Sequence, residues 1–138
     1  MTKKVLILCT HNSSRSQMAE GLLRELADGQ MEVYSAGTEP SRVHPLAIKA
    51  MAERGIDISG HTSKHLSQFL DDTLDYVITV CDDANETCPV FPGAAHRIHW
   101  SFPDPSAAEG SEEERLAVYR TVRASIEDRL KGWLAESP

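Results

Sequence analysis

The feature that most constrains the fold is the alternation of short apolar runs with segments that have helical spacing. Residues 5–8 form an uninterrupted apolar run of strand length, and residues 76–80 form a second that contains one threonine. Such runs are typical of strands covered on both faces. Met18, Leu22 and Leu26 lie between them at four-residue spacing, which favours one face of a helix. The alternation predicts an α/β fold in three layers, with helices flanking a four-stranded parallel sheet.

Turn and capping residues predict the other elements. Residues 31–36 favour a second strand, and residues 97–100 favour a weaker fourth strand. A helix is expected from Pro45 to a glycine cap at Gly55, and a shorter helix from about 63 to 70.

A long helix is predicted for the C-terminal part of the chain. Ser111 and Glu114 have the spacing of a capping box, which marks a helix start. One face of this helix is striped with apolar residues, namely Leu116, Tyr119, Val122, Ile126, Leu130 and Trp133.

Length and charge limit the class of protein. The 138 residues predict a single domain over 1–138, long enough to bury a core without disulfides. The net charge of −7 makes nucleic acid and anionic membranes unlikely partners. No apolar run approaches the ~20 residues that span a bilayer, and the N-terminal run is too short for a signal peptide. Three cysteines, an odd number, without a signal peptide predict a cytoplasmic protein with free thiols.

The loop after the first strand has the residues of an oxyanion site. It contains a cysteine, five residues, an arginine and a serine, and a predicted helix follows. Backbone N–H groups at such a helix start form an anion nest, and the Arg15 fork matches two oxygens of phosphate or arsenate. We expect this positive field and a hydrogen bond from Ser16 to lower the pKa of Cys9. The alternative is a buried structural cysteine beside a capping loop. The predicted oxyanion-binding residues are Thr10, His11, Asn12, Ser13, Ser14, Arg15 and Ser16.

The cysteines also suggest redox chemistry. Cys9 and Cys81 each follow a predicted buried strand, so parallel neighbours would bring both thiols to one edge of the sheet. Cys88 lies two helical turns after Cys81, or about 10 Å along a helix, whereas a disulfide needs Cα atoms within roughly 7 Å. A bond between them therefore requires a loop or an unwound helix. Residues 82–87 are mostly poor helix formers and Pro89 blocks a helix, which favours such a mobile segment.

Zinc is an alternative interpretation of these thiols. The four candidate ligands are Cys81, Cys88, His96 and His99. Their spacing lacks the close cysteine pair of structural zinc sites, and the histidines lie in or next to a predicted strand. We therefore favour redox-active thiols and predict no metal site.

The motifs resemble one protein family over nearly the whole chain. Residues 9–16 resemble the active-site loop of the low-molecular-weight protein tyrosine phosphatase fold. Within that fold the chain is most similar to thioredoxin-coupled arsenate reductases. The matching stretches are 9–20, 34–37, 56–63, 80–84, 87–89 and 99–105.

This resemblance implies a mechanism and partners. Cys9 is the expected nucleophile, Arg15 the oxyanion clamp and Asp104 the general acid. Cys9 attacks arsenate, Cys81 then attacks the sulfur of Cys9 and releases arsenite, and Cys88 attacks Cys81 to free Cys9. Thioredoxin is the expected reductant of the resulting disulfide, and no cofactor is implied. Without the resemblance, the Asp-Pro pair at 104–105 would favour a simple turn.

Two departures from the family pattern affect these expectations. Ser106 follows the Asp-Pro pair where tyrosine phosphatases of this fold usually have an aromatic residue, which weakens the phosphotyrosine interpretation. Some reductases bind potassium through four residues, of which Asn12, Glu20 and Ser35 match, but Lys64 stands in place of the aspartate. A lysine ammonium fits the place of the cation, so no potassium site is predicted.

Two rival functions remain open at this point. A phosphatase acting on phosphotyrosine or aryl phosphates would use the same loop, either as the main activity or as a side activity. A redox-responsive binding protein would use only the cysteines, and it would leave Arg15 and Asp104 without a role. The Cys81 and Cys88 pair favours the reductase.

Overall fold

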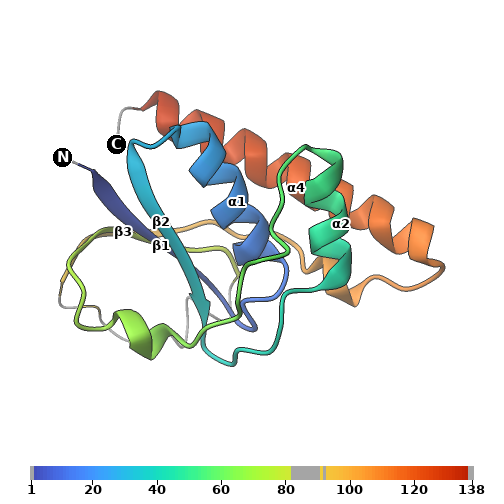
Figure 1. The fold of residues 1–138 in the computed structure, drawn as a ribbon, viewed down its shortest axis with the longest axis horizontal. Helices are drawn as coiled ribbons and strands as arrows, with labels where there is room; N and C mark the ends of the chain where they lie inside the picture. Colours follow the sequence, from blue (N-terminus) through green and yellow to red (C-terminus); the bar gives the residue numbers. More distant parts are fainter. Residues whose placement is uncertain (1, 82–90, 92, 137–138) are drawn as a thin grey trace.

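The predicted four-stranded parallel sheet is confirmed. The computed structural model describes residues 2–81, 91 and 93–136 (Figure 1). All strand pairs are parallel and the strand order is β2-β1-β3-β4. The strands are β1 (Lys3–Cys9), β2 (Met31–Gly37), β3 (Leu74–Thr79) and β4 (Ala94–His99). Because β1 and β3 are parallel neighbours, their carboxyl ends lie side by side.

Three helices pack together over one face of the sheet (Figure 1). They are α1 (Arg15–Ala27), α2 (Pro45–Glu53) and α4 (Glu112–Ala135). The capping box predicted at the start of α4 is confirmed, because Ser111 Oγ accepts from the Glu114 amide and the Glu114 side chain accepts from the Ser111 amide. The predicted apolar stripe of α4 is buried from Leu116 to Trp133. Among the described helices none is long and apolar enough to cross a membrane.

The opposite face of the sheet carries a short 3-10 turn, η1 (Leu66–Phe69). Ser35 of β2 faces α1, so its neighbour Tyr34 points to the other face. There the Tyr34 ring lies 5.6 Å from the ring of Phe69.

The prediction of a helix from about 63 to 70 is wrong, because only this 3-10 turn forms. The Gly37 amide donates to the Lys64 carbonyl over 2.8 Å, and His65 bridges to Gly37 as a strand would. These contacts hold residues 64 and 65 in extended backbone. The His65 side chain then caps the turn by accepting from the Ser67 amide.

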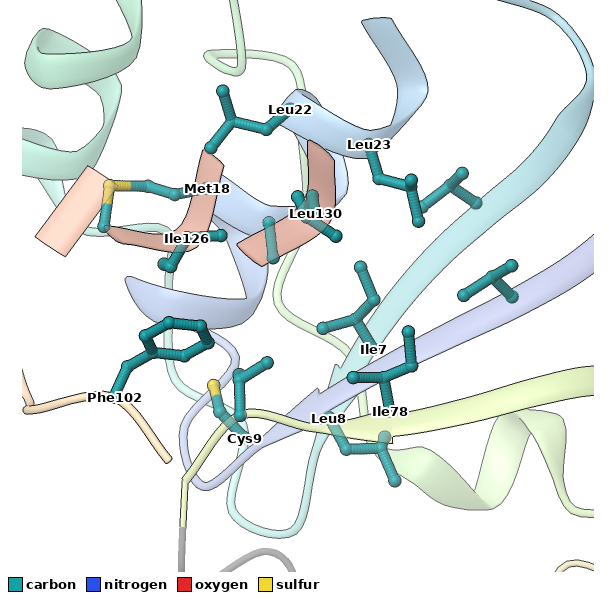
Figure 2. Close-up of a cluster of buried hydrophobic side chains, with 14 of the residues drawn as sticks. Ile7, Leu8, Cys9, Met18, Leu22, Leu23, Ile78, Phe102, Ile126 and Leu130 are labelled. Atoms are coloured by element: carbon teal, nitrogen blue, oxygen red, sulfur yellow. The ribbon is translucent and has the colours of Figure 1, made fainter. Parts of the chain in front are cut away.

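Cys9, the last residue of β1, lies at the edge of the hydrophobic core. Figure 2 shows a cluster of buried side chains from β1, β3, α1 and α4 that includes Cys9 and Phe102. The side chains of Ile7, Leu8, Met18 and Leu22 in this cluster are fully buried. Cys9 therefore lies where the apolar core meets the polar loop at the carboxyl edge of the sheet.

Candidate active site

The loop from Cys9 to Arg15 is held in shape by the buried side chain of Asn12. Its backbone has φ 49°, in the left-handed region that asparagine tolerates better than most residues. The side-chain oxygen accepts from the Lys64 amide at 2.9 Å. The side-chain nitrogen donates to Ser16 Oγ at 2.8 Å and to Ser35 Oγ at 2.9 Å. Every side-chain group of Asn12 thus fixes the loop to a neighbouring segment.

A glycine on the adjacent strand permits the loop to come this close. A Cβ atom at Gly37 would lie 2.5 Å from the Thr10 carbonyl oxygen and 2.9 Å from the Asn12 amide nitrogen. Real Cβ contacts are longer than this, so the loop requires glycine at the end of β2.

The Cys9 thiol is buried and hydrogen-bonded to Ser16 Oγ at 2.8 Å. Ser16 Oγ accepts from Asn12, so its own proton is available to Cys9. The expectation of a lowered Cys9 pKa is wrong for these contacts. Burial raises the pKa of the Cys9 thiol, and the hydrogen bonds of Ser16 and the charge of Arg15, which lower it, offset only part of that effect. The sequence does not show how deeply the thiol sits in the core.

Arg15 is the first residue of α1, and its guanidinium extends along the site. Arg15 Nη1 donates to the Phe102 carbonyl at 3.2 Å, and Arg15 Nη2 lies 3.8 Å from Asp104 Oδ2. Both contacts orient the fork toward the same side of the loop. The small hollow at this place is lined by Cys9, His11, Ser13, Ser14, Arg15, Asp104 and Ser106.

The Asp104 carboxylate lies at the rim of this hollow. Its Oδ1 accepts from both the amide and the hydroxyl of Ser106, at 2.9 Å and 2.7 Å. Burial raises the pKa of the Asp104 carboxyl, but the hydrogen bonds from Ser106 and the charges of Arg15 and His11 outweigh burial and hold it below its usual value. Asp104 is therefore a carboxylate at neutral pH.

The second described cysteine meets the loop from the neighbouring strand. Cys81 follows the end of β3 and is buried, and its Sγ lies 3.4 Å from Thr10 Oγ1. The electrostatic effect of Cys81 is one of the causes that raise the pKa of Cys9. Both thiols are free. Cys88 lies outside the described residues, so the structure does not test its position.

The predicted oxyanion-binding residues fall into two groups. His11, Ser13, Ser14 and Arg15 line the hollow. Asn12 and Ser16 lie behind the loop and brace it, while Thr10 is turned toward Cys81. The loop backbone is fixed from outside as well, since the amides of Glu39 and Ser41 donate to the Thr10 and His11 carbonyls.

Two residues that support the site were missed by the sequence reasoning. Tyr119 was predicted only as part of the apolar stripe, yet its hydroxyl lies 3.0 Å from Ser14 Oγ. Gln17 is fully buried, and its amide nitrogen donates to the carbonyls of Asn12 and Thr62, both at 3.0 Å. A tyrosine within an apolar stripe and a glutamine in a first helical turn were the available signals, because their polar groups need partners once buried.

Lys64 lies near Glu20, one of the three residues that match the potassium ligands. Its ammonium donates to the Thr62 carbonyl at 2.8 Å. Burial lowers the Lys64 pKa, while the nearby Glu20 carboxylate raises it in part. Glu20 is buried and accepts from Ser35 and Arg24.

The histidines weighed as zinc ligands have other contacts. The His96 ring stacks on Tyr76 with centroids 5.2 Å apart, and His99 Nδ1 lies 2.8 Å from Thr79 Oγ1. Within residues 2–81, 91 and 93–136, no three His, Cys, Asp or Glu side chains gather as metal ligands would.

A buried cysteine, a helix start, an arginine fork and a carboxylate therefore surround one hollow at the carboxyl edge of a parallel sheet. Such an arrangement suits attack by a thiol on a bound oxyanion. The chain belongs to the low molecular weight phosphotyrosine protein phosphatase family, whose sequence profile matches residues 4–137.

Similar proteins carry a more specific name. An arsenate reductase of Halalkalibacterium halodurans is 49% identical over 132 residues, which cover 95% of each chain. A solved structure described as an arsenate reductase in the phosphate binding state has TM-score 0.84 and 40% identity, and covers 98% of both chains. The thioredoxin-dependent arsenate reductase of Corynebacterium glutamicum has TM-score 0.75 and 32% identity over 98% of this chain and 61% of that one. The likeness thus extends over nearly the whole chain.

Proposed function

We propose that this protein reduces arsenate to arsenite through a relay of Cys9, Cys81 and Cys88, and that thioredoxin regenerates it. The observation that carries the proposal is the second buried thiol, Cys81, whose Sγ lies 3.4 Å from the hydroxyl of Thr10, the residue that follows Cys9. Ester hydrolysis has no use for a thiol there, whereas reduction requires one. The names of the similar proteins support the same reaction.

The first step is attack of Cys9 on arsenic. The hollow receives the oxyanion, and the Arg15 fork and the loop amides neutralise its charge. A sulfur–arsenic bond forms and an arsenic–oxygen bond breaks. Because burial favours the thiol form of Cys9, the proton of the thiol leaves with the departing oxygen as water. Ser16 stabilises the developing thiolate by donating to its sulfur.

The second step is attack of Cys81 on the sulfur of Cys9. A Cys9–Cys81 disulfide forms, the sulfur–arsenic bond breaks, and its electron pair reduces arsenic from the +5 to the +3 state. The thiol proton and solvent protons leave with arsenite. The Thr10 hydroxyl lies against Cys81 Sγ and stabilises the attacking thiolate as a hydrogen-bond donor.

The relay then returns Cys9 to its thiol. Cys88 attacks Cys81, which forms a Cys81–Cys88 disulfide and releases Cys9. The dithiol of thioredoxin reduces this disulfide by thiol–disulfide exchange. Each turnover thus passes two electrons from thioredoxin to arsenic.

Arsenite production with thioredoxin, thioredoxin reductase and NADPH tests this proposal. Wild-type protein should turn over many times. Cys81→Ser should release no arsenite, whereas Cys88→Ser should release about one per enzyme and stop as a Cys9–Cys81 disulfide. Peptide mapping identifies that disulfide. Normal multiple turnover by Cys88→Ser would refute the three-thiol relay.

Aryl phosphatase activity is the second candidate function, favoured by the Asp104 carboxylate opposite Arg15 in the hollow. It needs Cys9, Arg15 and Asp104 but neither of the other cysteines. Cys81→Ser should therefore retain whatever ester hydrolysis the wild type shows. Loss of both activities in Cys81→Ser would mean that Cys81 serves the fold.

A further inference from the structure

The contacts of Asp104 are unusual for a residue that has to donate a proton. Both donors of Ser106 point at the same oxygen, the amide at 2.9 Å and the hydroxyl at 2.7 Å. The other oxygen faces Arg15 Nη2 at 3.8 Å. The amide and the guanidinium can only donate, and the Ser106 hydroxyl, which can also accept, is placed here as a donor. The arrangement therefore fits a carboxylate and opposes its protonated form.

The charged and titratable groups around Asp104 act in the same direction. His11 and Arg15 face it from the loop and from α1, and both favour the carboxylate. His44, which caps α2, and Tyr119 of α4 face it from the other packed elements. Neither His44 nor Tyr119 forms a hydrogen bond with Asp104 among the contacts of the described residues. Among the described residues, Ser106 is thus the only one whose uncharged side chain forms a hydrogen bond with the Asp104 carboxylate.

The two candidate reactions differ in their need for a proton donor. In ester cleavage, a sulfur–phosphorus bond forms and the bond from phosphorus to the ester oxygen breaks. That oxygen carries no proton, so it leaves as an anion unless a carboxyl group protonates it. The leaving oxygen of arsenate is a hydroxyl, which exchanges protons with the other arsenate oxygens and with solvent. It departs as water without a protonated Asp104.

We propose that Ser106 is a specificity-determining residue, which holds Asp104 as a hydrogen-bond acceptor and thereby suppresses ester hydrolysis relative to arsenate reduction. Ser106 acts through Asp104 and is a positioning residue in this sense. The part of the proposal that concerns arsenate reduction rests on the proposed function. The part that concerns ester hydrolysis rests only on the geometry of the hollow.

The test compares two esters in the same enzyme. Phenyl phosphate has a strongly basic leaving group that needs a proton, and 4-nitrophenyl phosphate has a weakly basic one that does not. In Ser106→Ala, kcat/KM for phenyl phosphate should rise by roughly tenfold, part of the ~10²–10⁴ that general acid catalysis supplies. The value for 4-nitrophenyl phosphate should change much less. Ser106→Thr keeps both donors and should keep the wild-type ratio of the two esters.

Two further measurements separate this effect from a structural one. Loss of the hydroxyl raises the pKa of Asp104, so the alkaline limb of the phenyl phosphate profile should move to higher pH in Ser106→Ala. Adding Asp104→Asn to Ser106→Ala should abolish the gain.

An unchanged ester ratio, or an equal gain for both esters, would overturn the proposal. A gain that survives Asp104→Asn would also overturn it. Arsenite production by the wild type, measured in parallel, decides the proposed function separately. Its absence would leave the ester comparison valid as a test of how Ser106 controls Asp104.

Discussion

Replacing Gly37 with alanine tests how the sheet shapes the oxyanion loop. Gly37 ends β2 and pairs with Cys9 at the carboxyl end of β1. The added Cβ would lie 2.5 Å from the Thr10 carbonyl oxygen, 2.9 Å from the Asn12 nitrogen and 3.0 Å from the Cys9 carbonyl oxygen. All three are backbone atoms, so no rotation of a side chain relieves the contact. The loop has to move away from β2.

The expected cost follows from the size of this overlap. Adding one methyl group to a tightly packed site destabilises a protein by about 1–3 kcal/mol. For a chain of this length, that lowers the melting temperature by roughly 3–15 °C. Moving the loop also displaces the amides that we propose bind the oxyanion. A loss of about 1.4 kcal/mol in binding free energy weakens phosphate binding tenfold, and we expect at least that.

Gly132→Ala is the matched control. Gly132 lies in α4, and nothing is within 4 Å of a Cβ placed there. Alanine in a helix is better than glycine by about 0.5–1 kcal/mol, so this variant should melt slightly higher and bind phosphate as the wild type does.

The assay combines thermal unfolding by circular dichroism with calorimetric titration of phosphate. If Gly37→Ala keeps the melting temperature and phosphate affinity of the wild type, the close approach of β2 does not shape the loop. If only the melting temperature falls, the contact supports the fold and has no part in oxyanion binding.

Three further substitutions probe the site. Ser16→Ala removes a hydrogen bond that lowers the Cys9 pKa, so the pH profile of Cys9 alkylation by iodoacetamide should shift to higher pH; a shift to lower pH would contradict this. Thr10→Val should slow arsenite release in a single turnover by up to about tenfold, more than it slows ester cleavage, because one hydrogen bond to Cys81 is lost. Arg15→Lys should lower kcat/KM by about 10²–10³, since a point charge cannot replace a two-pronged contact; near-normal activity would place the clamp elsewhere.

The sheet and the place of the site were predictable from local pattern. An apolar run that ends in a polar loop and then a helical stripe is a strand–loop–helix unit, and repeating it implies parallel strands. The carboxyl edge of such a sheet is where ligands bind, so Cys9 and Cys81 were expected there together. The structure brings Cys81 against Thr10, the residue after Cys9.

The features that the sequence pattern did not predict depend on contacts between segments that are distant in the sequence. The helix expected from 63 to 70 is shortened because Gly37, far away in sequence, binds the Lys64 carbonyl. The pKa of Cys9 is raised because the core reaches the thiol. Local sequence contains the charges that lower this pKa but not the packing that raises it. Burial is a property of the whole fold, so the balance required the structure.

The contacts of this site explain how one family can serve two reactions. Cys9 and Arg15 lie on the unit formed by β1 and α1, and both line the hollow. On our proposals, the residues that select the reaction lie elsewhere, Cys81 after β3 and Ser106 after Asp104. Cys81 follows the end of β3, and Ser106 lies in a short 3-10 turn over residues 105–107, so both belong to connecting segments outside the β1–α1 unit. Ser106→Ala combined with Cys81→Ser should favour ester hydrolysis over arsenate reduction, because the first frees a proton donor and the second removes the reductive step. If Ser106→Ala changes kcat/KM for phenyl phosphate by the same factor with and without Cys81→Ser, the two positions act independently. Strong coupling between them would instead mean that they share one structural element.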